Sequence, residues 1–200
     1  MAVTALGCVL AYLIGAIPVG FIVARLAGGL DIRRAGSGTI GATNVLRTLG
    51  WLPAVITLLG DIAKGYVAVT VARALVAEPW GAAGGAVLAI VGNCWPVFLR
   101  FRGGKGVATG FGAFLALAPW ATAPAGLVWL AITASFRYVS LASVMACLCL
   151  PLGVALLGYP RAAVAAAAVA AVIIILRHRE NLRRLAQGRE PRLGQRASPA

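Results

Sequence analysis

Acidic residues and histidine are scarce in this sequence of 200 residues. It has five Asp and Glu residues and one His against 18 Lys and Arg residues, and charged residues make up only 12% of the chain. The five acidic residues are scattered, so the carboxylate cluster that metal-dependent transfer enzymes use is missing. We therefore expect no metal and no other cofactor.

Long polar segments are missing as well. Apolar residues make up 61% of the chain, and its mean hydropathy is +0.93. Water cannot solvate such a chain as a small globule. A helix needs about 20 apolar residues to cross a hydrocarbon core of roughly 30 Å, which leaves no room for a soluble domain. We predict a single all-α integral membrane domain over residues 1–200, with a short cytoplasmic tail from about residue 177.

The apolar residues form six segments. The first has no basic residue before Arg25, so we expect it to remain as a helix and not to be a cleaved signal peptide. The fourth holds Pro119 and Pro124 where a helix would have to continue, so it is one kinked span or two short ones of about 15 residues. The six segments are Ala2–Leu26, Leu52–Val76, Trp80–Leu99, Val107–Phe136, Val139–Tyr159 and Ala162–Leu176.

The positions of the basic residues favour two spans in the fourth segment. With seven helices and an outside N-terminus, only Arg73 and Arg161 lie outside, Lys64 lies within a span, and all other Lys and Arg residues face the cytoplasm. Membrane proteins concentrate Lys and Arg in their cytoplasmic loops. We predict seven transmembrane helices with a cytoplasmic C-terminus, and we attribute the net charge of +13 to topology and not to nucleic-acid binding.

The four cysteines, Cys8, Cys94, Cys147 and Cys149, lie in or beside apolar segments. They form no C-x-x-C pair and have no histidine at metal-ligand spacing. We interpret all four as buried thiols.

The loop after the first span has the residue types of an anion-binding turn. Three glycines allow the backbone to turn its N–H groups inward, hydroxyl and amide side chains add donors, and an arginine can bind phosphate oxygens in pairs. A short helix could start after the last glycine and attract negative charge. The alternative is a flexible turn between helices. The residues are Gly36, Ser37, Gly38, Gly41, Thr43, Asn44 and Arg47.

A second loop places Lys105 among Gly103, Gly104 and Gly106. It resembles a phosphate-binding turn with one ammonium at its centre, although it does not match the Walker A pattern. A basic loop beside the membrane would explain the two preceding arginines, but it would not explain three glycines around one lysine.

Two further pairs stand out because each lies on one helix face. His178 and Asn181 are three residues apart in the tail, where the alternative is an amphipathic helix that contacts anionic lipid. Asp61 and Lys64 lie midway along the second span. Charges at that depth are costly and are usually paired or functional, and we favour a structural ion pair that supports the site.

Together these segments resemble the bacterial acyl-phosphate:glycerol-3-phosphate acyltransferase family, often called PlsY. The resemblance spans almost the whole chain, and its three motifs occur in order. The first is Gly36-Ser-Gly with Gly41-Ala-Thr-Asn-Val-Leu-Arg47, the second is Pro96, Phe98-Leu99 and Gly103-Gly-Lys-Gly-Val-Ala-Thr109, and the third is His178, Asn181, Leu185, Gly188 and Glu190.

The resemblance implies transfer of a fatty acyl group from acyl phosphate to the first hydroxyl of glycerol 3-phosphate, giving lysophosphatidate and phosphate. It implies an active site at the cytoplasmic face of the bacterial inner membrane, contact with membrane lipids, and no direct use of acyl-CoA or acyl carrier protein. The catalytic residues would be Ser37, Arg47 and Lys105, which hold phosphate and developing charge, and His178 and Asn181, which orient the acceptor. The substrate-binding residues would be Gly38, Gly41, Thr43, Asn44, Gly103, Gly104, Gly106, Thr109, Ser143, Gly188 and Glu190.

The chain departs from the family pattern at three places. Thr39 and Ile40 stand where the family usually has Asn-Pro, and Asn93 stands where it has His. Two other functions therefore stay open: a small anion or lipid transporter that uses Asp61 and Lys64, and a weakened family member with a role in assembly. An acyltransferase mechanism with His and Asp five residues apart is excluded, since Arg183 follows His178 at that distance.

Overall fold

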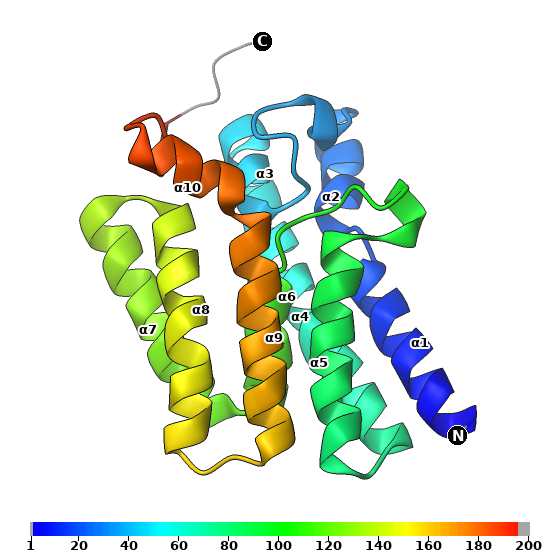
Figure 1. Cartoon of the computed structure of the whole chain (residues 1–200). Helices are drawn as coiled ribbons and strands as arrows, with labels where there is room; N and C mark the ends of the chain where they lie inside the picture. The colour runs from blue at the N-terminus through cyan, green and yellow to red at the C-terminus, as the bar shows by residue number, and fades with distance from the viewer. Residues whose placement is uncertain (1, 196–200) are drawn as a thin grey trace.

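Helices are the only regular elements in residues 2–195, the part of the chain that this computed structural model describes (Figure 1). Two short 3-10 turns, Ile32–Arg34 and Val97–Leu99, lie in the loops. The α-helices are α1 (Ala2–Ala16), α2 (Val19–Gly28), α3 (Ala42–Leu49), α4 (Trp51–Leu75), α5 (Pro79–Cys94), α6 (Val107–Leu117), α7 (Pro119–Phe136), α8 (Val139–Leu156), α9 (Arg161–Arg177) and α10 (Arg179–Ala186).

The long helices stand side by side, and their short connections alternate between two ends of the molecule (Figure 1). The start of α1 lies at one end, and α3 and α10 lie across the other. Helix α4 packs against α1, α5 and α6, and α8 packs against α7 and α9. The confirmed part of the prediction is thus an all-α membrane fold.

Prolines divide two of the predicted segments. The first breaks at Ile17–Pro18 into α1 and α2, which was not predicted. The fourth breaks at Ala118, whose backbone is not helical and which precedes Pro119, where the α conformation is disfavoured. Two helices are therefore confirmed there, but they have 11 and 18 residues instead of about 15 each, because Pro124 stays inside α7.

Four helical segments are long and apolar enough to cross a membrane, or five if the bent pair α9 and α10 counts as one span. These segments are Val3–Gly28, Trp51–Leu75, Pro79–Leu99 and Val139–Leu156. Helix α6 is shorter than a span and covers about 16 Å at 1.5 Å per residue. Seven spans therefore stay a prediction.

Small residues bring the helices close together. A Cβ on Gly65 of α4 would stand 2.0 Å from the Thr109 carbonyl oxygen of α6, and a Cβ on Gly112 would stand 1.9 Å from the Ile62 carbonyl oxygen. The alanines of α9 from Ala162 to Ala171 are mostly buried. Close backbone approach through small residues is typical of helices that pack within a membrane.

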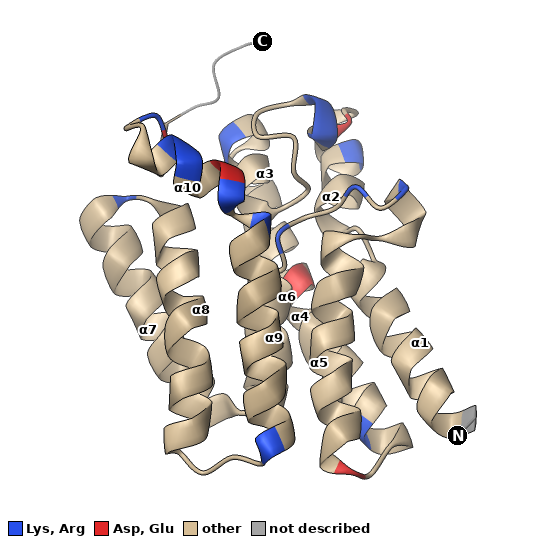
Figure 2. Cartoon of the chain, viewed as in Figure 1, with Lys and Arg blue, Asp and Glu red and all other residues tan. Residues whose placement is uncertain are grey.

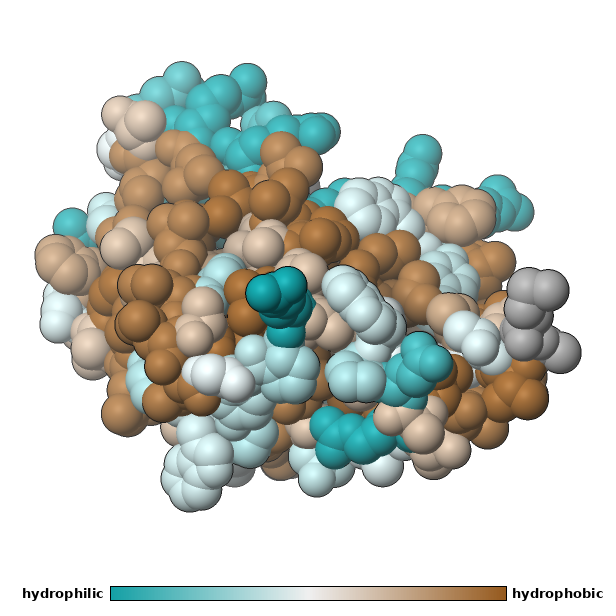
Figure 3. Space-filling model, turned by 60° about the horizontal axis from the view of Figure 1, so that its bottom comes forward, coloured by the Kyte–Doolittle hydropathy of each residue, from teal (hydrophilic) through white to brown (hydrophobic). Residues whose placement is uncertain are grey.

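The outer faces of the helices are strongly apolar, and brown, hydrophobic atoms cover much of the surface in Figure 3. Large side chains such as Leu26, Trp120 and Leu156 are more than three-quarters exposed, which suits contact with lipid. The prediction of four buried thiols is wrong for Cys8, which is exposed, and Cys149 is only half-buried. Both lie on faces that the apolar pattern alone could not distinguish from the core.

Most charged residues lie at the end of the molecule that carries α3 and α10 (Figure 2). The loops 29–41 and 95–106 and the chain after α9 meet at this end. Arg196, the last of the predicted tail arginines, lies outside the described residues. The fold therefore brings the three motif segments together.

Candidate active site

One side chain, Asn44, holds the loop before α3 in shape. Its Nδ2 donates to the carbonyl oxygens of Ile32, Ala35 and Thr39 at 3.1, 3.0 and 2.8 Å, and its Oδ1 accepts the backbone N–H of Ser37 at 2.8 Å. A carboxamide has two N–H donors, and the protein itself uses both. The structure therefore places Asn44 as the anchor of the loop and leaves it no free donor for a substrate.

The glycines of this loop are needed for its conformation. Gly36 and Gly38 have φ values of 54° and 71°, which side chains rarely adopt. A Cβ on Gly36 would also stand 2.2 Å from Asn44 Oδ1. Gly41 ends the loop as the residue before α3, where the first N–H groups of a helix have no intrahelical partner and attract anions.

The second glycine loop is clamped at Gly104 by groups distant in sequence. Its N–H donates to the Asn93 carbonyl oxygen at 2.9 Å. Its own carbonyl oxygen accepts Arg177 Nε and Nη2 at 3.1 and 2.9 Å. A Cβ on Gly103 would stand 2.2 Å from the Asn93 carbonyl oxygen, so the loop presses directly on the end of α5. This clamp fixes the backbone that carries Lys105.

Lys105 begins a polar chain that runs into the tail. Its Nζ donates to Asn181 Oδ1 at 2.5 Å, Asn181 Nδ2 donates to Glu190 Oε1 at 2.7 Å, and Arg184 Nε donates to Glu190 Oε2 at 2.9 Å. Burial lowers the pKa of Lys105 to about 8, although the Glu190 charge opposes the shift. Burial alone would raise the pKa of Glu190, but its hydrogen bonds lower it on balance.

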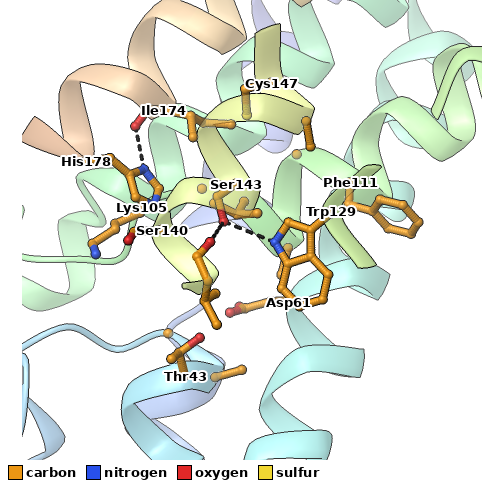
Figure 4. Close-up of a pocket in the computed structure, with 18 of the residues that line it drawn as sticks. Thr43, Asp61, Lys105, Phe111, Trp129, Ser140, Ser143, Cys147, Ile174 and His178 are labelled. Carbon is orange, nitrogen blue, oxygen red and sulfur yellow. Dashed lines mark hydrogen bonds between the residues drawn. The ribbon is translucent and has the colours of Figure 1, made fainter. Parts of the chain in front are cut away.

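The ring of His178 has a defined protonation state. The side chain is 3% exposed, and Nδ1 lies 2.8 Å from the Ile174 carbonyl oxygen (Figure 4). Because a carbonyl only accepts, Nδ1 carries the proton and Nε2 keeps a lone pair. Burial and then the Lys105 charge lower the pKa of His178 to about 4, so the ring is neutral near pH 7 and can accept a proton.

Arg47 reaches the tail from α3. Its Nη2 donates to the Pro191 carbonyl oxygen at 3.1 Å, while Nε is buried and has no partner among the described residues. Burial lowers the pKa of this guanidinium. A buried, unpaired donor on a cation is suited to bind an anionic oxygen.

These polar groups line part of a cavity of roughly 450 Å³ (Figure 4). This size is typical of sites for small molecules. Most of the other lining residues are apolar and come from α6, α7, α8 and α9, with Leu58 and Ile62 added by α4. They include Phe111, Phe114, Leu127, Leu130, Ala146, Cys147, Leu150 and Ile174. The cavity can therefore accommodate a molecule with an anionic head and an apolar chain.

The intramembrane pair lies beneath these loops. Lys64 Nζ donates to the Ile17 carbonyl oxygen at 2.7 Å and to Asn93 Oδ1 at 2.9 Å. It also forms an ion pair with Asp61, whose Oδ1 lies 2.7 Å away but has no hydrogen-bond partner among the described residues. Asp61 also lines the cavity, which the sequence interpretation as a purely structural pair did not include.

The structure brings most of the predicted site residues to the cavity, but not all. Its lining includes Ser37, Gly41, Thr43, Asn44, Arg47, Lys105, Gly106, Ser143, His178 and Glu190. The predicted residues outside the lining are Gly38, Gly103, Gly104, Thr109, Asn181 and Gly188. Thr109 is fully buried, with its carbonyl against α4, and Asn181 acts through its bond to Lys105.

The lining residues that were not predicted as site residues include Asn93, Ser140 and Trp129. Asn93 is a polar residue in an apolar segment, a signal that could have identified it. Ser140 also lines the cavity, and its buried hydroxyl has no partner among the described residues. Trp129 Nε1 donates to Ser143 Oγ at 3.1 Å, and that hydroxyl donates to the Val139 carbonyl oxygen. Nothing in the sequence around Trp129 distinguishes it from a membrane-facing aromatic residue.

Comparison with known proteins gives one consistent result. Residues 5–188 match the family model described as glycerol-3-phosphate acyltransferase. The chain is 46% identical over 192 residues to the glycerol-3-phosphate acyltransferase of Rubrobacter xylanophilus and 50% identical over 195 residues to that of a strain of Thermus thermophilus. Each alignment covers 94% of this chain and 94% of the relative.

Two solved structures of the same family are also similar to this chain. The crystal structure of PlsY (YgiH), an integral membrane glycerol 3-phosphate acyltransferase, in its glycerol 3-phosphate form has a TM-score of 0.91 and 40% identity, covering 96% of both chains. The lysophosphatidic acid form of that protein has a TM-score of 0.89 and 39% identity, covering 96% of this chain and 95% of that one.

Proposed function

We infer the donor and the course of the reaction from the premise that this chain belongs to the glycerol-3-phosphate acyltransferase family. It is an integral membrane enzyme that acylates glycerol 3-phosphate and gives lysophosphatidate. We propose that its donor is a long-chain acyl phosphate and that the acceptor is the primary hydroxyl of glycerol 3-phosphate.

The composition of the cavity lining carries this proposal. An acyl phosphate has an anionic head on an apolar chain, and the cavity joins cationic groups, Arg47 and Lys105, to an apolar lining. Glycerol 3-phosphate brings a second phosphate. Two glycine-rich loops and the N-terminus of α3 supply backbone and cationic donors for both anions. The apolar lining lets the donor enter from the bilayer without a carrier.

The reaction is a single acyl transfer. The acceptor hydroxyl oxygen attacks the carbonyl carbon of the acyl phosphate and forms the new ester bond. The bond between that carbon and the phosphate oxygen breaks, and inorganic phosphate leaves with the electron pair. The hydroxyl proton passes to His178 Nε2 or to a phosphate oxygen of the substrates. No covalent enzyme intermediate is required, because acyl phosphate is already activated.

Electrostatic positioning supplies most of the catalysis. Lys105 and Arg47 stabilise the negative charge that grows on the carbonyl and leaving phosphate oxygens. Ser37 lines the same cavity from the first loop and can donate to a phosphate. Asn181 fixes the Lys105 ammonium, and neutral His178 orients the acceptor hydroxyl.

We also propose the membrane arrangement. The pair α1 and α2 and the helices α4, α5, α6, α7, α8 and α9 run between the two ends of the molecule (Figure 1), which supports seven crossings with α6 as a short one. Charged residues gather at the end with α3 and α10 (Figure 2), so this end faces the cytoplasm of a bacterial inner membrane. Labelling of single cysteines in the α4–α5 and α8–α9 connections from the outer side tests this orientation, and labelling from the cytoplasmic side alone contradicts it.

A donor comparison tests the proposed reaction. The purified protein in lipid vesicles is given labelled glycerol 3-phosphate with palmitoyl phosphate, palmitoyl-CoA or palmitoyl-acyl carrier protein. We expect lysophosphatidate and one equivalent of phosphate from palmitoyl phosphate alone. Product from either thioester contradicts the donor assignment, and no product from any donor favours a weakened member or a transporter.

A further inference from the structure

The carboxamide oxygen of Asn93 forms a hydrogen bond within the protein, whereas its nitrogen does not. Its Oδ1 accepts Lys64 Nζ at 2.9 Å. Because the ammonium can only donate, this bond fixes the amide with oxygen toward Lys64 and nitrogen away from it. The Nδ2 group has no acceptor among the described residues, and it keeps some accessible surface although the residue as a whole is only 4% exposed.

Asn93 lies at the wall of the cavity, and its free end lies against the loop that carries Lys105. Asn93 lines the same cavity as Lys105, Asp61 and His178. Its Nδ2 lies 2.8 Å from where a Cβ on Gly104 would be, so the amide packs directly under the loop that carries Lys105. A donor that the protein leaves without an acceptor, and that keeps accessible surface beside the cavity, is available to an acceptor atom of a ligand.

We propose that Asn93 Nδ2 donates a hydrogen bond to a phosphate oxygen of a bound substrate beside Lys105. The buried Asp61–Lys64 pair sets its orientation. This inference rests on the proposed function, since it assigns a contact within that site.

Two substitutions separate this role from a structural one. Asn93→Ala removes both the acceptor and the donor, whereas Asn93→His can retain both. Thr57→Val is the matched control, because Thr57 is fully buried in α4, bonds only within its helix and lies outside the cavity lining. Each variant is compared with wild type and Lys105→Ala for KM of each substrate and kcat, and for the shift in Tm that glycerol 3-phosphate or inorganic phosphate produces.

We expect Asn93→Ala to raise KM for one substrate, or to lower kcat, by about tenfold or more, as for loss of a hydrogen bond to a charged group. A raised KM for glycerol 3-phosphate, together with loss of the phosphate-induced Tm shift, assigns the contact to the phosphate of glycerol 3-phosphate. A raised KM for acyl phosphate assigns the contact to the phosphate of that substrate. Asn93→His should restore activity to within a few-fold of wild type.

The proposal fails if Asn93→Ala keeps both KM values, kcat and the phosphate-induced Tm shift of wild type. It also fails if Asn93→Ala lowers the Tm of the ligand-free protein but leaves its ligand-induced shifts and KM values intact, since that is a structural role. Lack of wild-type activity with acyl phosphate refutes the proposed function instead, and the phosphate-induced Tm shift still tests Asn93 in that case.

Discussion

The two glycine-rich loops of the active site are built in different ways. The first, residues 32–41, is held by Asn44 through four hydrogen bonds to backbone atoms at most 12 residues away. The second holds Lys105 through Asn93, Arg177 and Asn181, and the last two are more than 70 residues distant. The first loop can therefore form locally, whereas the second takes shape only when α5 and α9 have packed.

The largest expected effect comes from removing the cation that the second loop presents. Lys105→Ala should reduce kcat by about 1,000-fold or more, because electrostatic stabilisation of a developing anion is usually the largest catalytic contribution. Arg102→Ala is the matched control, since Arg102 is an exposed cation of the same loop and should retain wild-type turnover. Near-normal turnover in Lys105→Ala would remove Lys105 from the mechanism.

The first loop should respond to loss of its single anchor. Asn44→Ala leaves several backbone groups without partners, and we expect a Tm lower by roughly 5–10 °C together with about 100-fold lower activity. Thr70→Ala removes an exposed hydroxyl that bonds within α4 and serves as the control. An unchanged Tm with wild-type activity would show that the loop has another source of order.

The clamp on the second loop should affect catalysis more than stability. Arg177→Lys keeps the charge but loses the paired bonds to the Gly104 carbonyl oxygen, and we expect about tenfold lower kcat/KM with little change in Tm. Arg179→Lys, at an exposed neighbouring arginine, should match wild type. Equal activity of the two variants would mean that the clamp does not position Lys105.

The smallest effect is a pH dependence specific to the second loop. Because the pKa of Lys105 is lowered to about 8, its charge is lost as the pH rises through 8, and kcat/KM should fall on that alkaline side. Between pH 8 and 10.5 the folded state binds fewer protons at this lysine than the unfolded state. The contribution of Lys105 to the free energy of unfolding therefore increases as the pH rises.

Parallel Tm and activity scans distinguish that titration from unfolding. We expect kcat/KM to halve near pH 8. Deprotonation of Lys105 should not lower the Tm over the same pH range. A flat kcat/KM up to about pH 9.5 would show that the ammonium keeps its proton at the site. Activity that falls only where Tm falls would assign the loss to unfolding.

Much of the molecule followed from patterns within short stretches of sequence. The hydropathy of the segments predicted helices in a membrane, and the break before Pro119 followed from the backbone restriction of a residue that precedes proline. The glycines, Asn44 and the downstream arginine predicted an anion-binding loop. These features depend on residues close together in the chain.

The buried or exposed position of single residues in the apolar helices could not be predicted from local sequence. Nothing local shows that Thr109 lies against α4 while Ser143 lines the cavity, since both are single hydroxyl residues in apolar helices. The same holds for Cys8, which is exposed, and Cys94, which is buried. The face that an apolar helix buries is set by its neighbours.

Local sequence was therefore enough to predict a bundle of membrane helices with an anion-binding loop at one end, because hydropathy and short-range hydrogen bonding are encoded within a few turns. The packed fold was needed to show that Asn93 and Arg177 bind the Gly104 backbone beside Lys105, that Asn181 accepts the Lys105 ammonium, and that Lys64 binds the oxygen of the Asn93 amide. These contacts join segments far apart in the chain, and they exist only after small residues have allowed α4, α5, α6 and α9 to pack closely.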